Sequence, residues 1–172
     1  LTGGTSGSCS SFAPTTSLAL LDMSWDYACG IDIFGALACG YNQEGPPPTG
    51  SFVDLAVGSD NACAIDTEGF VECWGVDAVG ETIPPPGTFV ALAAWSHRMC
   101  GIPASGTSVV CWGSAGTGTG YLSLPEVPYQ ALSIGYDNGC ALAVSGDLHC
   151  WDGPGLYNPS SSQFLTVAST YD

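Results

Sequence analysis

Basic side chains are almost absent from this sequence. Arg98 is the single Lys or Arg among 172 residues, against 16 Asp and Glu, so the formal net charge is −15. Proteins that bind nucleic acids use Lys and Arg to displace counterions from phosphates, and attraction to an anionic membrane needs the same side chains. No apolar run approaches the roughly 18 residues of a spanning helix. We therefore expect no nucleic-acid partner and no membrane insertion.

Charged residues of either sign are also scarce, at 10% of the chain, while 45% of the residues are hydrophobic. Acidic disordered segments combine high charge with low hydrophobicity, so this composition indicates a packed core instead. The 24 Gly and 12 Pro favour many tight turns. The length suits one ordinary domain, and the composition predicts an all-β protein.

The motifs of common active sites are missing. The chain has no Cys-x-x-Cys, no Cys/His cluster at zinc spacing and no Gly-x-Ser-x-Gly elbow. Its two histidines, His97 and His149, stand near no motif that would fix a base beside a nucleophile. The sequence predicts that this protein is not an enzyme and needs no cofactor.

Cysteine, in contrast, is abundant, with nine residues. After Cys9 the cysteines form four pairs whose members are ten or eleven residues apart. Regular cysteine pairs of this kind are typical of disulfides in oxidising compartments. We expect an extracellular or cell-surface location.

The pairs belong to an internal repeat. The four complete copies are Ser17 to Gly40, Ser51 to Gly75, Thr88 to Gly113 and Tyr129 to Asp152. Their first cysteines advance by 34, 37 and 40 residues, which is a supersecondary unit with variable loops rather than a helical period. This spacing divides one repeat domain, 1–172, into units of about 17–50, 51–87, 88–128 and 129–162, with half-units at 1–16 and 163–172.

Each unit predicts three strands. In the second unit these are Phe52 to Val57, Ala62 to Ile65 and Phe70 to Trp74, with a hairpin turn at Thr67-Glu68-Gly69. A turn midway between the two cysteines places them across adjacent strands. A bond closing so short a loop would stabilise the fold by about 2–3 kcal/mol. The Pro/Gly-rich linkers, such as Gly45-Pro46-Pro47-Pro48, should leave the sheet because proline cannot donate to its ladder.

The recurring F-x-x-(hydrophobic)-A-x-G motif, followed by C-(A/G)-(I/L) and then Cys-Trp, resembles the RCC1-like repeat (regulator of chromosome condensation). The Cys-Trp step occurs at Cys73-Trp74, Cys111-Trp112 and Cys150-Trp151, whereas the first unit has Cys39-Gly40. The chain is similar to the cysteine-paired variety of secreted bacterial proteins and plant receptor ectodomains. This resemblance implies a β-propeller of four-stranded blades. The expected fold is an all-β, propeller-like array with disulfides Cys29–Cys39, Cys63–Cys73, Cys100–Cys111 and Cys140–Cys150.

The two ends look like parts of a fifth unit. Gln163 to Asp172 aligns without gaps to Ser51 to Asp60, and Leu1 to Cys9 resembles Ile65 to Cys73. Three arrangements follow: closure of a small ring within one chain, head-to-tail contact between subunits that builds a filament, or a piece of a longer repeat protein. Across these arrangements Cys9 is predicted to be unpaired, intermolecular, or partnered with a cysteine outside this sequence.

Aromatic side chains recur in the turn before the first cysteine of a unit. We predict that they form a binding face, composed of Trp25, Trp95, Tyr136 and Tyr171. Tyr and Trp are enriched in binding hot spots and stack on sugars. Four aspartates recur nearby and would suit Ca²⁺, although Asp favours such turns in any case: Asp26, Asp60, Asp137 and Asp172.

The predicted function is therefore a non-catalytic extracellular RCC1-like repeat protein, a rigid scaffold for protein–protein binding or assembly. One alternative is a structural subunit that self-assembles head-to-tail into a filament through its half-repeats. A third is a secreted enzyme inhibitor or carbohydrate-binding module. The resemblance implies a protein partner, since RCC1-like propellers include a nucleotide-exchange factor and secreted β-lactamase inhibitors.

Overall fold

The structure is a computed structural model, and it describes residues 17–24, 27–40, 46–114, 124–136 and 138–152, together with the backbone of 155–157. All secondary-structure elements in these ranges are β-strands. The same ranges contain no helix long and apolar enough to cross a membrane. The strands are β1 (Leu18–Met23), β2 (Ala28–Asp32), β3 (Leu37–Cys39), β4 (Phe52–Val57), β5 (Asn61–Asp66), β6 (Val71–Gly75), β7 (Phe89–Trp95), β8 (Arg98–Pro103), β9 (Val110–Gly113), β10 (Tyr129–Ile134), β11 (Asn138–Ala143), β12 (Leu148–Asp152) and β13 (Gly155–Tyr157).

Consecutive strands pair antiparallel into four sheets. Sheet 1 is β1–β2–β3, sheet 2 is β4–β5–β6, sheet 3 is β7–β8–β9 and sheet 4 is β10–β11–β12–β13. The resemblance implied four strands per blade, but within the described residues only sheet 4 has a fourth strand. Prolines account for part of this difference, because the linkers after β3 and β6 contain Pro46–Pro48 and Pro84–Pro86, which cannot donate to a strand ladder.

One disulfide in each sheet joins the second strand to the third. The two cysteines of every pair are directly opposed in the register. Their Cα atoms lie 4.0 Å apart in all four pairs, somewhat closer than the roughly 4.5 Å of an ordinary non-hydrogen-bonded pair. The bonds are Cys29–Cys39, Cys63–Cys73, Cys100–Cys111 and Cys140–Cys150. The expected all-β, disulfide-stapled fold class is confirmed.

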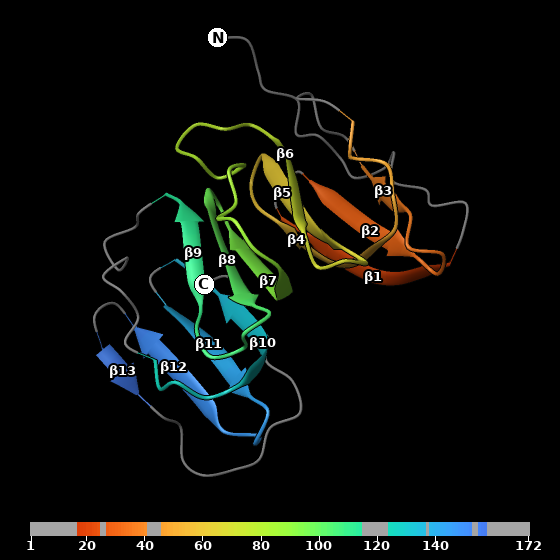
Figure 1. The fold of residues 1–172 in the computed structure, drawn as a ribbon. Coiled ribbons are helices and arrows are strands. Elements are labelled where there is room, and N and C mark those ends of the chain that lie inside the picture. Colours follow the sequence, from red (N-terminus) through yellow and green to blue (C-terminus); the bar gives the residue numbers. More distant parts are fainter. Residues whose placement is uncertain are drawn as a thin grey trace, which may run out of the picture.

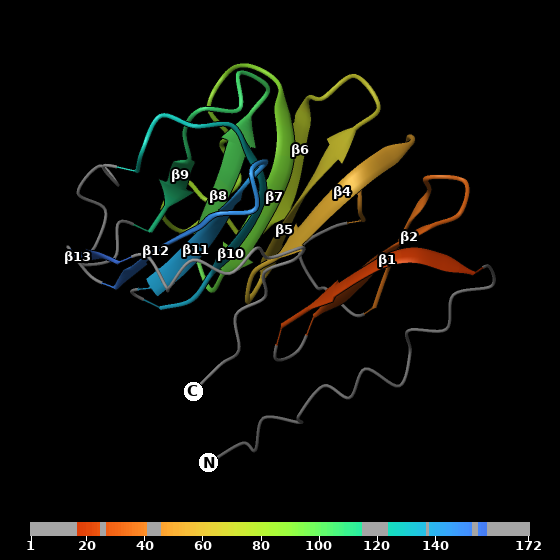
Figure 2. The same ribbon diagram turned by 90° about the horizontal axis from the view of Figure 1, so that it is seen from below.

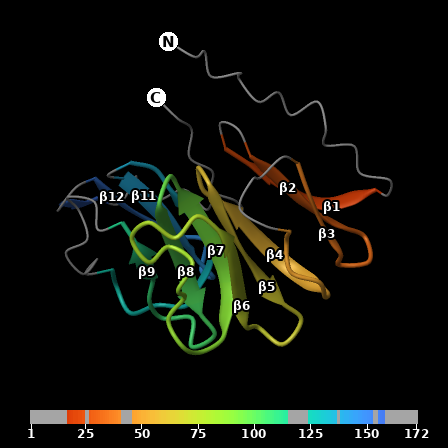
Figure 3. The same ribbon diagram turned by 90° about the horizontal axis from the view of Figure 1, so that it is seen from above.

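The sheets pack face to face in chain order along an arc (Figure 1), and Figure 2 and Figure 3 show them spread like the sectors of a fan. Each interface uses the same two surfaces. The disulfide side of sheet 2, with Cys63 and Ile65, packs on Leu92, Met99 and Trp112 of sheet 3. The other two interfaces repeat this arrangement. The core is therefore a series of inter-sheet layers rather than one central cluster.

The array has two ends, which we name for use below. At the turn end, the first strand of each sheet turns into the second, for example at Ser96–His97. At the hairpin end, the second strand turns into the third, for example at Thr67–Gly69. Gly69 has a φ of +94°, and its carbonyl accepts a hydrogen bond from Phe89 N–H of the next sheet (2.8 Å). A Cβ there would also meet Thr88 at 3.1 Å, so this turn requires glycine.

Two carboxylates also tie first strands together. Asp22 Oδ2 in β1 accepts from Val57 N–H in β4 (2.7 Å), and Asp54 Oδ2 in β4 accepts from Leu92 N–H in β7 (2.7 Å). Burial raises the pKa of both carboxyls, and the negative charge of Asp22 adds to the rise at Asp54, although backbone hydrogen bonds act in the opposite direction. Ionisation of these two carboxyls at neutral pH therefore lowers the free energy of unfolding.

Asp54→Asn should therefore gain stability relative to the wild type as pH rises. A carboxyl whose folded pKa lies above its ordinary value of 3.8 contributes stability that is complete below that value. The contribution is lost as pH rises through the folded pKa, and an amide keeps the acceptor for Leu92 without the charge. Urea unfolding at several pH values between 4 and 7 measures the difference.

The control for this comparison is Glu72→Gln, at an exposed carboxylate on β6. A free-energy difference between wild type and Asp54→Asn that stayed constant across this range would contradict the prediction.

Candidate binding site at the turn end

The structure places two of the four predicted face residues, Trp95 and Tyr136, against each other. Trp95 is the last residue of β7, and Tyr136 lies in the turn between β10 and β11, so they come from neighbouring sheets. Their ring centroids are 5.1 Å apart and the rings meet edge to face at 69°, a favoured aromatic geometry. Tyr136 is 66% exposed. Trp95, in contrast, is half-buried and packs against the core layer between sheets 3 and 4. Tyr136 is therefore the exposed ring of the pair, and Trp95 supports it from the side.

Arg98 anchors the turn that carries Tyr136. It is the first residue of β8 and is only 8% exposed. Its Nε donates to Ser114 O of its own sheet, and its Nη1 donates to Tyr136 O of sheet 4, both at 3.3 Å. A buried guanidinium is costly unless its N–H groups find acceptors. The only basic side chain of the sequence thus links the two sheets that carry the aromatic pair.

The turn of sheet 3 differs from its equivalents in sheets 2 and 4. Those turns begin with glycine and end with asparagine, at Gly58–Asn61 and Gly135–Asn138. A Cβ on Gly58 or Gly135 would lie 2.3 or 2.4 Å from the asparagine Oδ1, so the glycine is required there. In sheet 3, Trp95 and Arg98 occupy the same two register positions. The paired change allows a tryptophan where sheets 2 and 4 require glycine.

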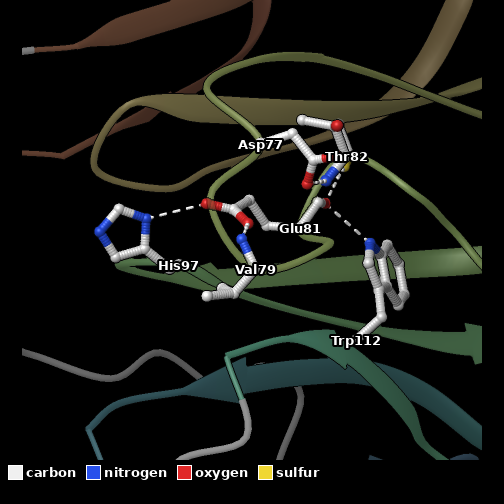
Figure 4. A network of polar contacts seen from close by, with 7 residues as sticks. Asp77, Val79, Glu81, Thr82, His97 and Trp112 are labelled. Atoms are coloured by element: carbon white, nitrogen blue, oxygen red, sulfur yellow. Dashed lines mark hydrogen bonds and ion pairs between the residues drawn. The ribbon is translucent and has the colours of Figure 1, made fainter.

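Glu81 supports the turn of sheet 3 from the loop between β6 and β7 (Figure 4). Its side chain is fully buried. Oε1 lies 3.0 Å from His97 Nδ1, and Oε2 accepts from Val79 N–H at 2.7 Å. Its backbone carbonyl accepts from Trp112 Nε1 at 2.9 Å. One residue therefore connects the loop, the exposed turn and the core tryptophan of sheet 3.

The charged form of Glu81 is favoured despite its burial. Burial alone would raise its pKa, but hydrogen bonds from the backbone of Val79, of Glu81 itself and of Ala78, together with that from His97, outweigh it. The pKa of Glu81 therefore lies below its usual value. An ionised carboxylate beside His97 orients the imidazole at the surface.

The remaining predicted residues are placed as follows. Asp60 is exposed, and its carbonyl accepts from Val76 N–H; the described residues contain no group of three or more His, Cys, Asp or Glu that could hold a metal ion. His149 Nδ1 lies 2.8 Å from the Tyr129 hydroxyl, whose pKa burial raises to about 12. The following predicted residues lie outside the described ranges: Cys9, Trp25, Asp26, Asp137, Tyr171, Asp172 and both half-units, 1–16 and 163–172.

Two residues of this site were missed by the sequence reasoning. Glu81 lies in a Pro-rich linker, and the linkers differ in length and sequence between units, so no recurring position marks it. Arg98 could have been found from the sequence. It is the only basic residue and it follows an aromatic turn residue closely, which favours a specific hydrogen-bond acceptor within the protein for its guanidinium. The structure thus places one exposed ring, Tyr136, and one half-buried ring, Trp95, at neighbouring turns beside the buried charged residues Arg98 and Glu81.

Comparison with known proteins gives a clear result at the level of fold. No protein-family model matches the chain, and no curated protein matches its sequence. The CRINKLY WD40 ectodomain of the Arabidopsis thaliana receptor kinase ACR4 is 23% identical, with a TM-score of 0.64 over 80% of this chain and 51% of that chain. The ectodomain of the Physcomitrella patens receptor kinase CR4 is 21% identical, with a TM-score of 0.65 over 84% and 44%.

Yeast RCC1 (Prp20) is also similar, at 15% identity and a TM-score of 0.61 over 81% of this chain and 44% of that chain. The chain thus spans about half the length of the solved structures it matches. These likenesses confirm the propeller fold, including its RCC1-like form, that the repeat predicted.

Proposed function

We propose that this chain is an extracellular, RCC1-like scaffold that binds a protein partner through its turn end. The observation that carries the proposal is the Trp95–Tyr136 contact between two adjacent sheets at the turn end, in which Tyr136 is exposed, Trp95 is half-buried and buried Arg98 is the anchor. Aromatic side chains held rigidly on a surface bind at a low entropic cost. Each sheet with the linker that follows it then corresponds to one repeat unit, at 17–50, 51–87, 88–128 and 129–162.

The compartment and the class of partner have separate support. Four disulfides are typical of proteins folded in an oxidising compartment, and two similar structures are receptor ectodomains. Yeast RCC1 was solved with Kap60 bound, and a further structure of Prp20p is reported with its binding to Gsp1p and histones. The net charge of −15 favours a protein over a nucleic acid.

The proposal predicts that Trp95→Ala and Tyr136→Ala each weaken partner binding by about tenfold or more, as removal of a hot-spot aromatic does. The partner is first isolated from the extracellular protein fraction of the source organism on the immobilised chain. It is then purified, and its Kd is measured against the wild type and both variants. The control is Ser108→Ala, at an exposed loop residue between β8 and β9.

Circular dichroism establishes that each variant is folded. An unchanged Kd for both aromatic variants would show that the partner uses another surface. If the immobilised chain captures only further copies of itself, and the electron microscope shows filaments, the assembly function would be favoured instead.

A further inference from the structure

The hairpin end of the array exposes an unusual number of large apolar side chains. Phe34 is 74% exposed, Ile33 60% and Val144 60%, and each occupies the tip of a hairpin. Three more lie beside the tips at this end: Val53, Phe70 and Val90, which are 60%, 50% and 52% exposed. All four sheets contribute to this set. Exposed apolar side chains gathered at one end of a protein favour a site of interaction there.

Backbone hydrogen bonds hold the tips in a continuous row. The tip glycines of sheets 1 to 3 each accept a bond from the first strand of the next sheet, as in Gly35 O with Phe52 N–H (2.8 Å) and Gly106 O with Tyr129 N–H (2.7 Å). The row therefore has the rigidity of the sheets rather than that of separate loops. Hairpin turns ordinarily prefer Gly, Asn, Asp and Ser. The adjacent Ile33 and Phe34 depart from this preference, so the formation of the turn does not explain them.

The charge at the hairpin end is uniformly negative in the part of the chain that the structure describes. Asp32 and Asp66 each accept two N–H bonds within their own hairpins, while Glu68 and Asp147 are exposed. Arg98, the only basic side chain, is buried at the opposite end. A partner that complements this surface carries positive charge beside apolar groups.

We propose that the hairpin end is a second docking surface, and that it takes a segment of a partner protein in which Lys or Arg side chains stand next to aliphatic or aromatic ones. The proposal rests on the proposed function only in that the partner is a protein; the surface and its chemistry are separate from the Trp95–Tyr136 pair. A scaffold with a docking surface at each end can hold two proteins at once.

The test uses a synthetic 14-residue peptide of leucine and lysine in amphipathic order, with its affinity measured by calorimetry at physiological salt. Two comparison peptides replace every leucine by serine or every lysine by glutamate. Ile33→Ser combined with Phe34→Ser should weaken binding of the Leu/Lys peptide at least tenfold. Both comparison peptides should bind at least tenfold more weakly than the Leu/Lys peptide.

Net charge is controlled with matched double variants. Glu68→Gln with Asp147→Asn should weaken binding about three- to tenfold. Asp60→Asn with Asp152→Asn removes the same charge from exposed residues at the turn end and should change the affinity less than twofold. Tyr136→Ser should also leave the peptide affinity unchanged, which separates this surface from that of the proposed function.

Several outcomes would overturn the proposal. Equal affinity for the Leu/Lys and Ser/Lys peptides would mean attraction by charge alone. Equal losses in the two charge variants would mean that the hairpin end is not the site. Size-exclusion chromatography that showed a dimer dissociated by the Ile33 and Phe34 changes would assign the surface to a second copy of the chain instead.

Discussion

Glu81→Ala is expected to lower the free energy of unfolding by about 2–3 kcal/mol, because it leaves buried hydrogen-bonding groups without partners. The substitution removes the acceptor for Val79 N–H and the partner of His97 Nδ1. Its side chain is fully buried, so the change also opens a cavity between the loop and sheet 3. Urea unfolding at pH 7 measures the loss.

Two controls separate the network from a general effect of removing a glutamate. Glu72→Ala, at an exposed position on β6, should change stability by no more than about 0.5 kcal/mol. Glu81→Gln keeps the side-chain volume and one acceptor oxygen, so its loss should lie between those of the two alanine variants. An equal loss in Glu72→Ala and Glu81→Ala would contradict the role assigned to this network.

The pH dependence of the unfolding free energy of these variants gives a second test of the Glu81 network. A carboxyl with a lowered folded pKa contributes stability that is present above its ordinary value of 4.5 and is lost as pH falls through the folded pKa. Glu81→Gln should therefore lose less stability than the wild type when the pH is lowered below about 4.5. This sign is opposite to that expected for Asp54→Asn, so the two carboxylates can be distinguished in one titration series.

The strands and the fold class were predictable because the same pattern occurs four times. One hairpin with a Cys–Cys spacing of ten is weak evidence, but recurrence in register indicates where each strand lies to within about one residue. The predicted strand Phe52 to Val57 agrees with β4, and the hairpin at Thr67-Glu68-Gly69 lies where it was expected. The second strand begins one residue earlier than predicted, at Asn61.

The site could be predicted only in part, because it depends on contacts between units. The aromatic residues of the turn were visible in the repeat, and the structure brings Trp95 and Tyr136 together. The partners of Asp22 and Asp54 lie on the following sheet, so sequence shows the charges in apolar strands but not the N–H groups they accept from. Exposure of Phe34 likewise depends on which side of a hairpin faces the next sheet.

Loss of the Cys63–Cys73 disulfide is the other change with a large expected effect. The bond closes a short loop, with a sequence separation of 10, and for such a loop the restriction of the unfolded chain corresponds to about 3 kcal/mol. Cys63→Ala combined with Cys73→Ala should therefore lower the free energy of unfolding by about that amount. Cys63 is fully buried between sheets 2 and 3, so loss of packing adds to the loop effect.

Reductant separates the two contributions. In reductant, the wild type and the Cys63→Ala, Cys73→Ala variant both lack every disulfide, so the difference between their free energies of unfolding measures the packing of the two sulfur atoms alone. The Cys29–Cys39 bond closes a loop of the same sequence separation, 10, so Cys29→Ala with Cys39→Ala is the matched variant. Similar losses are expected in the two variants, because the loop length and the burial of Cys29 and Cys63 are alike. A double-alanine variant as stable as the oxidised wild type would instead contradict the stabilising role assigned to the Cys63–Cys73 bond.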